Sequence, residues 1–546
     1  MFQGHPKGLY VAFFANMGER FGFYTMMGIL VLFLQAKFNL APGKAGMIYS
    51  VFYFAIYALA LLGGFIADRT QNYKGVVGTG VVVMFIGYLL LAIPGLGLFA
   101  ALAGLATIAF GNGLFKGNLQ ALVGQMYDAP EYSKLRDTAY SIFYMGINVG
   151  AMFAPNAADA VQTWWLRKNG FLYDADLPAL CNQFIANTLP DTTKLAELAA
   201  KVSGGPVADL QAFAAKYLDV FATGYNYAFG IAGIAMLISL TSYLLFKRHL
   251  PERKKAAAGA SDAPTMTWEE EKPRLIALGL VFLVVIFFWM SFHQNGLTMT
   301  FFARDYTEKV LGPLQNVLFN IWSLLSLGLA AVGVVLLVKP SSDTKKRLIG
   351  LALAAVFSAV AYSFYRSFPA ENPVKPVIFQ HFNAFFVVFL TPVVVGAFAW
   401  LRSKGKEPSA PRKIGIGMII ASLGFIVLLV GSMGLPSPAE LGGQPSPARV
   451  SAQWLVQSYL VLTFAELFLS PMGLSFVSRV APPRFQGLMQ GCWLGATAIG
   501  NQLLFVGSTM WTRIEVWQVW GIFILCCLLS AAVIFMLMKR LERVTS

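Results

Sequence analysis

The amino-acid sequence predicts an all-α protein that crosses a membrane about fourteen times, because apolar runs of roughly 20 residues, the length that spans a bilayer, recur along the chain. Two further observations support this fold class. Hydrophobic residues make up 57% of the 546 residues and charged residues only 12%, with a mean hydropathy of +0.63. Soluble proteins carry about a quarter charged residues. The loops between the apolar runs are alternately basic and non-basic, which is typical of a multi-pass membrane protein.

The basic loops also indicate orientation. Lysine and arginine cluster in every second loop, so these loops and both termini are expected on the cytoplasmic side of the cell membrane. The first apolar run is expected to stay as a span, because it is long, carries charges and lacks a small-residue cleavage site. The net charge of +15 is not arranged as a basic stripe with aromatics, so nucleic-acid binding is not expected. No metal-ligand spacing or cofactor motif is present.

The chain divides at changes of composition. Residues 1–248 are predicted to form a first six-helix bundle, with an outer-side insert at 166–222 whose mixed charges and leucines predict short amphipathic helices. A segment rich in Lys, Ala and Pro at 249–273 indicates a cytoplasmic linker. Residues 274–546 are predicted to form a second six-helix bundle, with an extra two-helix hairpin at about 315–366.

The first span contains a charged pair, Glu19-Arg20, between apolar residues. A charge near the bilayer centre costs roughly 2.5–3.5 kcal/mol, so both side chains must face protein or water. Asn16, Arg20 and Tyr24 have i, i+4, i+8 spacing and share one helix face. A permanently charged arginine that binds carboxylates, beside an acid that can titrate, indicates a coupling device. A salt bridge that joins two helices is the alternative.

Lys116 lies within the fourth apolar run, where an acidic partner, water or substrate would be needed to keep it charged. It is a candidate site residue, unless its side chain reaches the cytoplasmic surface. Tyrosines at helical spacing indicate either packing or ligand contacts. The remaining candidates of this part of the chain are Tyr57 in the second span and Tyr144 and Asn148, one turn apart, in the fifth.

Three spaced motifs resemble the proton-dependent oligopeptide transporter family. They are Glu19-Arg20-Phe21-x-x-Tyr24, Phe115-Lys116-x-Asn118 and Phe143-Tyr144-x-x-Ile147-Asn148-x-Gly150. Four motifs of the second half extend the resemblance: Phe288-Trp289-x-x-x-His293-Gln294, Asn383-Ala-Phe-Phe, Glu466-x-x-x-Ser470-Pro471 and Gly491-x-Trp493. Asp68-Arg69, at the end of the second span, resembles the cytoplasmic gating motif of major facilitator transporters.

The resemblance implies a major facilitator fold of two six-helix bundles that takes up di- and tripeptides with protons, as a monomer and without a cofactor. Arg20 and Lys116 would bind the peptide carboxylate, and Glu466 its ammonium group, while Pro471 would let its helix bend during gating. The implied substrate site consists of Arg20, Tyr24, Tyr57, Lys116, Tyr144 and Asn148 from one half and Asn383, Glu466, Ser470 and Trp493 from the other.

Two positions depart from the family's pattern. The first acid of the first-helix motif is replaced by Asn16, and the seventh-helix glutamate by His293. Two titratable acids of the family's pattern are thus missing, so the family's proton pathway cannot be assigned to this chain in full. Glu19, His293 and Glu466 remain as proton carriers, with Lys116 as their partner. Transport of another small zwitterion or anion is therefore an alternative. A membrane-embedded enzyme with His293 as base lacks a nucleophile or metal set; a non-transporting receptor is a further alternative.

Overall fold

The computed structural model describes residues 4–128, 130–132, 135–251, 266–339, 342–482 and 485–545. Below, residues 4–251 are called the N-terminal half and residues 266–545 the C-terminal half. The elements of the N-terminal half are α1 (Gly8–Phe38), α2 (Pro42–Thr70), α3 (Tyr73–Ala92), α4 (Leu98–Met126), α5 (Arg136–Lys168), α6 (Leu177–Ile185), α7 (Thr193–Ser203), α8 (Leu210–Phe246) and η2 (Lys247–His249).

The C-terminal half adds long helices, short helical turns and one small pair of strands. They are α9 (Trp268–Phe292), η3 (His293–Gly296), α10 (Thr298–Asp305), β1 (Val310–Leu311), α11 (Pro313–Phe319), α12 (Ile321–Val338), α13 (Thr344–Ser367), β2 (Asn372–Pro373), η4 (Pro376–Gln380), α14 (His381–Ser403), α15 (Ala410–Gly431), α16 (Pro438–Leu441), α17 (Gln453–Val480), α18 (Gln486–Gln502), α19 (Phe505–Met510), α20 (Val516–Met536) and α21 (Met538–Thr545). The strands β1 and β2 pair antiparallel.

Helix ends follow local chemistry. Asn39 and Gln71 adopt left-handed backbone conformations directly after α1 and α2. Asp209 accepts backbone N–H groups at the start of α8, as an N-cap does. Thr267 and Glu270 form a capping box, so α9 begins at Trp268, inside the segment predicted as linker. Most of that linker, residues 252–265, lies outside the described residues.

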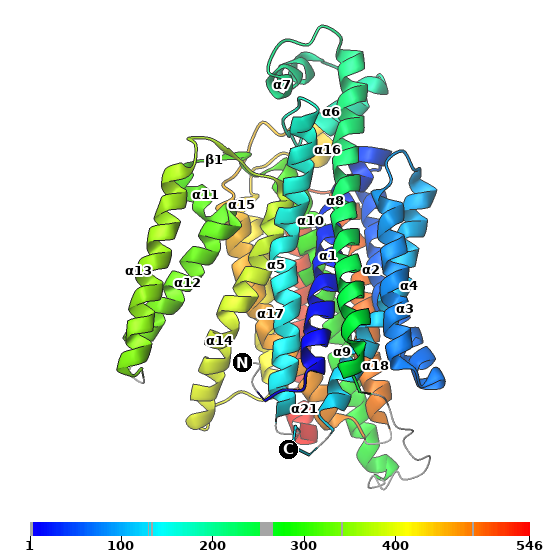
Figure 1. Cartoon of the computed structure of the whole chain (residues 1–546), viewed down its shortest axis with the longest axis vertical. Coiled ribbons are helices and arrows are strands. Elements are labelled where there is room, and N and C mark those ends of the chain that lie inside the picture. Colours follow the sequence, from blue (N-terminus) through cyan, green and yellow to red (C-terminus); the bar gives the residue numbers. More distant parts are fainter. Residues whose placement is uncertain are drawn as a thin grey trace.

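The long helices run side by side in one bundle (Figure 1). In the described chain, eleven helices are long and apolar enough to cross a membrane, and α5, α17 and α18 lie among them (Figure 1). The all-α, multi-pass fold class is thus confirmed, whereas the predicted count of about fourteen spans is not. The helix α1 continues through Glu19 and Arg20 without a break.

The helices contact one another both within each half and between the halves. In the N-terminal half α1 packs on α5 and α8, and α4 packs on α2 and α3. In the C-terminal half α15 packs on α17 and α20. Across the halves, α2 contacts α18 and α19, and α5 contacts α14. These interhelical surfaces surround the charged side chains described below.

The extra hairpin and the insert lie at the edges of the bundle. Helices α12 and α13 pack on each other and stand beside the bundle next to α14 (Figure 1). Helices α6 and α7 lie at the end opposite the two chain termini (Figure 1). α7 buries Leu195, Leu198 and Val202 and exposes Lys194 and Lys201, so it is amphipathic. Because α5 continues to Lys168 and α8 begins at Leu210, the segment between these helices is shorter than the predicted insert 166–222.

Candidate functional site

A buried ion pair lies in the middle of α1. Arg20 donates from Nε and Nη2 to the two carboxylate oxygens of Glu19, at 2.5 Å each. The exposed fraction is 4% for Arg20 and 1% for Glu19. Asn112 of α4 donates to the same carboxylate at 2.6 Å. Three N–H donors, two of Arg20 and one of Asn112, thus compensate a carboxylate that is removed from water, and this compensation is what a buried charge requires. Asn16, one turn earlier, bonds the backbone carbonyl of Phe143.

Lys116 of α4 lies close to this pair but is not paired itself. Its ammonium group lies 4.3 Å from the centre of the Tyr57 ring, a cation–π contact. Among the described residues it forms no ion pair, although it interacts electrostatically with Arg20 and Glu19. The structure therefore brings two cations and one carboxylate together on α1 and α4, with the aromatic ring of α2 beside them.

The C-terminal half contributes the carboxylate of Glu466, on α17, to a second polar cluster. Asn383 of α14 donates its side-chain amide to Glu466 of α17 at 3.0 Å and to Thr463 at 3.1 Å. Within the described chain Glu466 has no cationic partner. It interacts electrostatically with Tyr24, Tyr57 and Tyr144 of the N-terminal half.

His293 joins the two halves by hydrogen bonds. Its Nδ1 lies 2.5 Å from Oδ1 of Asn501 on α18, and its Nε2 lies 3.2 Å from the hydroxyl of Tyr53 on α2. Because an amide oxygen only accepts, Nδ1 carries a proton, whereas Nε2 can accept from the tyrosine hydroxyl or, when protonated, donate to it. The ring stacks on Trp289, with the centroids 4.7 Å apart. Both ring nitrogens are thus engaged by hydrogen-bond partners.

The other predicted positions differ in their surroundings. Asn148 is 8% exposed and bonds the carbonyl of Tyr144, whose side chain is 42% exposed. Trp493 is buried on α18 beside Phe282. Ser470 and Pro471 belong to α17, but their side chains lie outside the described residues.

The pair Asp68-Arg69 ends α2 on the side of the chain termini. Both residues are exposed, and Asp68 accepts a hydrogen bond from the hydroxyl of Tyr73 at the start of α3. Asp68 thus fastens the tight turn between α2 and α3.

Three residues that were not among the predicted site residues complete the site. Asn112, Tyr53 and Asn501 hold Glu19 and His293 in place. A polar side chain inside an apolar run was the available signal for Asn112 and Asn501, since such residues need a partner in a membrane. No group of three His, Cys, Asp or Glu side chains suited to a metal occurs among the described residues.

Comparisons with known proteins agree with this architecture. A permease for di- and tripeptides from Escherichia coli is 24% identical over 91% of this chain and 82% of its own length. The peptide transporter YePEPT of Yersinia enterocolitica is 26% identical over 92% of this chain and 87% of its own. The transporter YclF of Bacillus subtilis, of uncharacterized function, is 25% identical over 99% and 95%.

Solved structures share the fold. A mutant POT peptide transporter in complex with alafosfalin superposes with a TM-score of 0.68 at 23% identity, covering 100% of this chain and 96% of that one. A POT family transporter in complex with 5-aminolevulinic acid gives 0.68 at 19% identity, with coverage of 100% and 98%. The family model described as POT family matches residues 74–263 and 355–520. Since these two segments make up more than half of the sequence, the chain belongs to the POT family of membrane transporters.

Proposed function

We propose that this protein takes up di- and tripeptides together with protons, by alternating access between its two halves. The observation that carries the proposal is a division of charge across the site. Among the residues that the structure describes, the N-terminal half contributes Lys116, a cation without an ion-pair partner, and the C-terminal half contributes Glu466, a carboxylate without a cationic partner. A peptide zwitterion has the opposite charge at each end.

The cationic side suits the peptide carboxylate. Lys116 is held over Tyr57 with its charge uncompensated, so a carboxylate would replace the missing partner. Arg20 has a planar donor fork that fits carboxylates, but Glu19 occupies two of its donors. We therefore assign the first contact of the peptide carboxylate to Lys116. A second contact, to Arg20, would form when Glu19 releases the guanidinium group.

The opposite side suits the peptide ammonium group. Glu466 is oriented by Asn383, and Tyr24, Tyr57 and Tyr144 lie near enough to influence it. Aromatic surfaces accept varied side chains, which matches a carrier of many different peptides. We assign Asn148, Ser470 and Trp493 to the same site.

Glu19 is the proton carrier of this proposal. A proton on its carboxylate would remove the charge that holds the guanidinium of Arg20, and Arg20 would then be available to the substrate carboxylate. A proton on Nε2 of His293 would make this nitrogen the donor in its hydrogen bond with Tyr53 and place a positive charge at the contact between α2 and η3. Proton binding and substrate binding would thus favour each other.

The orientation follows from the basic loops and the fold. Both termini lie at one end of the bundle and the insert at the other (Figure 1). We propose that the end with the termini is cytoplasmic, that the membrane is the cell membrane, and that one chain transports as a monomer. Asp68, Arg69 and Pro471 are then gating residues on the cytoplasmic side.

Uptake of a labelled dipeptide into proteoliposomes tests the proposal. An inward proton gradient should drive accumulation above the equilibrium level, and a protonophore should abolish it. Unlabelled dialanine should compete in both conditions. Accumulation that is unchanged when the gradient is dissipated would disprove proton coupling, and a lack of dipeptide uptake with intact protein would disprove the substrate class.

A smaller zwitterion is the second candidate substrate. The neutral Asn16, which bonds Phe143 instead of titrating, departs from the family's motif, and one structural neighbour was solved with 5-aminolevulinic acid. Competition by amino acids and 5-aminolevulinic acid, but not by dipeptides, would favour this candidate. Competition by dipeptides alone would exclude it.

A further inference from the structure

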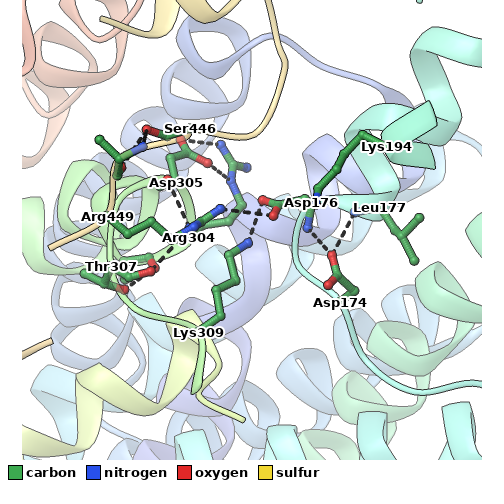
Figure 2. A network of polar contacts seen from close by, with 12 residues as sticks. Asp174, Asp176, Leu177, Lys194, Arg304, Asp305, Thr307, Lys309, Ser446 and Arg449 are labelled. Carbon is green, nitrogen blue, oxygen red and sulfur yellow. Dashed lines mark hydrogen bonds and ion pairs between the residues drawn. The ribbon is translucent and has the colours of Figure 1, made fainter. Parts of the chain in front are cut away.

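An acidic residue of the outer insert binds two cations of the C-terminal half. The carboxylate of Asp176, directly before α6, accepts from Lys309 at 2.5 Å and from Arg449 at 3.1 Å (Figure 2). We call these three residues the outer clamp. The side-chain exposure is 14% for Asp176 and 22% for each cation, so the ion pairs are only partly screened by water.

Hydrogen bonds to backbone groups fix the residues on both sides of the outer clamp. Asp174 accepts the backbone N–H groups of Asp176 and Leu177 at 2.9 and 3.2 Å and so fixes the turn that presents Asp176 (Figure 2). On the opposite side, Arg449 donates to the backbone carbonyls of Asp305 and Thr307, at 3.2 Å each. The clamp therefore connects two backbone segments that are each held in place by their own hydrogen bonds.

A second ion pair repeats the pattern nearby. Lys375, in the C-terminal half just before η4, bonds Asp159 of α5 and lies 4.5 Å from the centre of the Tyr173 ring. Burial lowers the pKa of Lys375 from its usual value, while Asp159 raises it. In both places the acid belongs to the N-terminal half and the cations to the C-terminal half, so the outer contact between the halves is electrostatically complementary.

The insert reaches the C-terminal half at one more point. Gln183, at the end of α6, donates to the carbonyl of Gly442 at 3.3 Å and accepts from Gln444 at 3.2 Å. Asp176 and Gln444 line a cavity of about 380 Å³, together with Gln35 and Ala36 of α1, Tyr173, Arg304 and Ser446. The insert thus covers a space that lies between the halves.

We propose that the part of the insert between α5 and α8, residues 169–209, holds the outer gate closed and releases it when the gate opens. Asp176 binds Lys309 and Arg449 while the outer side is closed and releases both when the halves separate there. Partly exposed ion pairs suit this role, because each contributes up to about 1 kcal/mol and is readily exchanged for water. The proposal rests on alternating access alone and does not depend on which solute is carried.

Cysteine labelling of the full-length protein in liposomes tests the proposal. Ala36, which is 8% exposed in the cavity wall, is replaced in the variant Ala36→Cys, in a background without Cys181, Cys492, Cys526 and Cys527. A membrane-impermeant maleimide added outside then reports opening of the outer side. Asp176→Asn should raise the labelling rate by roughly fivefold, since the loss of about 1 kcal/mol corresponds to this factor.

Two matched variants complete the test. Glu197→Gln neutralises an acid of the same insert whose partner is Lys194 of the same helix, and it should leave the labelling rate unchanged. Asp176→Lys combined with Lys309→Asp restores a pair of opposite charges and should return the rate toward that of the parent. Equal rates for Asp176→Asn and Glu197→Gln, or a failure of the reversed pair to slow labelling, would overturn the proposal. The labelling assay contains no substrate. Its outcome is therefore independent of whether the protein takes up dipeptides in the uptake assay.

Discussion

Glu19 binds Arg20, its neighbour in the chain, through both carboxylate oxygens, and the pair is almost completely buried. Asn112 is the second partner of this carboxylate. The arginine thus carries its own counter-ion on the same helix turn. In the proposed mechanism, a substrate carboxylate that takes the same two donors of Arg20 would compete with Glu19, and this competition would link the protonation of Glu19 to the occupancy of the site.

Glu19→Gln should uncouple transport from the proton gradient. The amide resembles a protonated glutamate and cannot release a proton, so Arg20 stays available to the substrate in all conditions. Accumulation of labelled dipeptide under an inward proton gradient should fall at least tenfold, to the equilibrium level, whereas exchange of labelled for unlabelled dipeptide should continue. Gradient-driven accumulation equal to that of the wild type would show that the proton binds elsewhere.

Lys116→Met should remove the preference for a free carboxylate. Methionine is one heavy atom shorter than lysine and fills most of the same space, but it lacks the ammonium group that contacts the Tyr57 ring. The affinity for a dipeptide should fall about tenfold or more, as expected for the loss of a charged hydrogen bond of roughly 1.5–3 kcal/mol. The affinity for the same dipeptide with an amidated C-terminus should change little.

Lys116→Arg is the control for this prediction, since it retains the positive charge. Competition of both peptides against a labelled dipeptide gives the two affinities for each variant. An equal loss for the free and amidated peptides would place the carboxylate away from Lys116.

Glu466→Gln should affect the other end of the peptide. The glutamine can still accept from Asn383 but no longer attracts an ammonium group. Wild-type protein should discriminate a dipeptide with a free amino group from its N-acetylated form, and the variant should lose most of this preference, about tenfold. Competition assays with the two peptides measure the ratio. A preserved ratio would assign the ammonium group to a different residue.

The sequence predicted much of the fold and less of the site geometry. Apolar runs and basic loops predicted the multi-pass helical fold, because length and hydrophobicity alone decide whether a helix can span a membrane. The contact of Glu19 with Arg20 was not predictable from helix spacing, which separates adjacent residues by about 100°. It depends on side-chain conformations and on the donor Asn112 of another helix.

Contacts between distant segments were also beyond the sequence. The mixed charges of the insert indicated amphipathic helices but not that Asp176 binds Lys309 and Arg449, because these residues approach only when the two halves pack. His293 was identified as a departure from the family's pattern, yet its partners Tyr53 and Asn501 come from two other helices. Helical periodicity predicts which face a residue lies on, not which helix covers that face.

Gly63→Ala should destabilise the packing of α2 on α4. A Cβ atom at Gly63 would lie only 2.0 Å from the backbone carbonyl oxygen of Gly113, and a backbone atom cannot yield as a flexible side chain does. Asn118 of α4 also bonds the carbonyl of Gly63 at 3.0 Å, so separating the helices would strain this bond as well. The cost should be about 1–3 kcal/mol, the range for overpacked interiors.

Gly64→Ala is the matched control, because a Cβ atom at Gly64 would meet nothing within 4 Å. Alanine also has the higher helix propensity, so this variant should be as stable as the wild type or slightly more stable. Thermal unfolding of the purified proteins in one detergent should therefore show a lower midpoint for Gly63→Ala only. Since α2 carries Tyr53 and Tyr57 and α4 carries Lys116, Gly63→Ala should also weaken dipeptide binding. Equal midpoints for both variants would mean that α2 and α4 can separate at this crossing without loss.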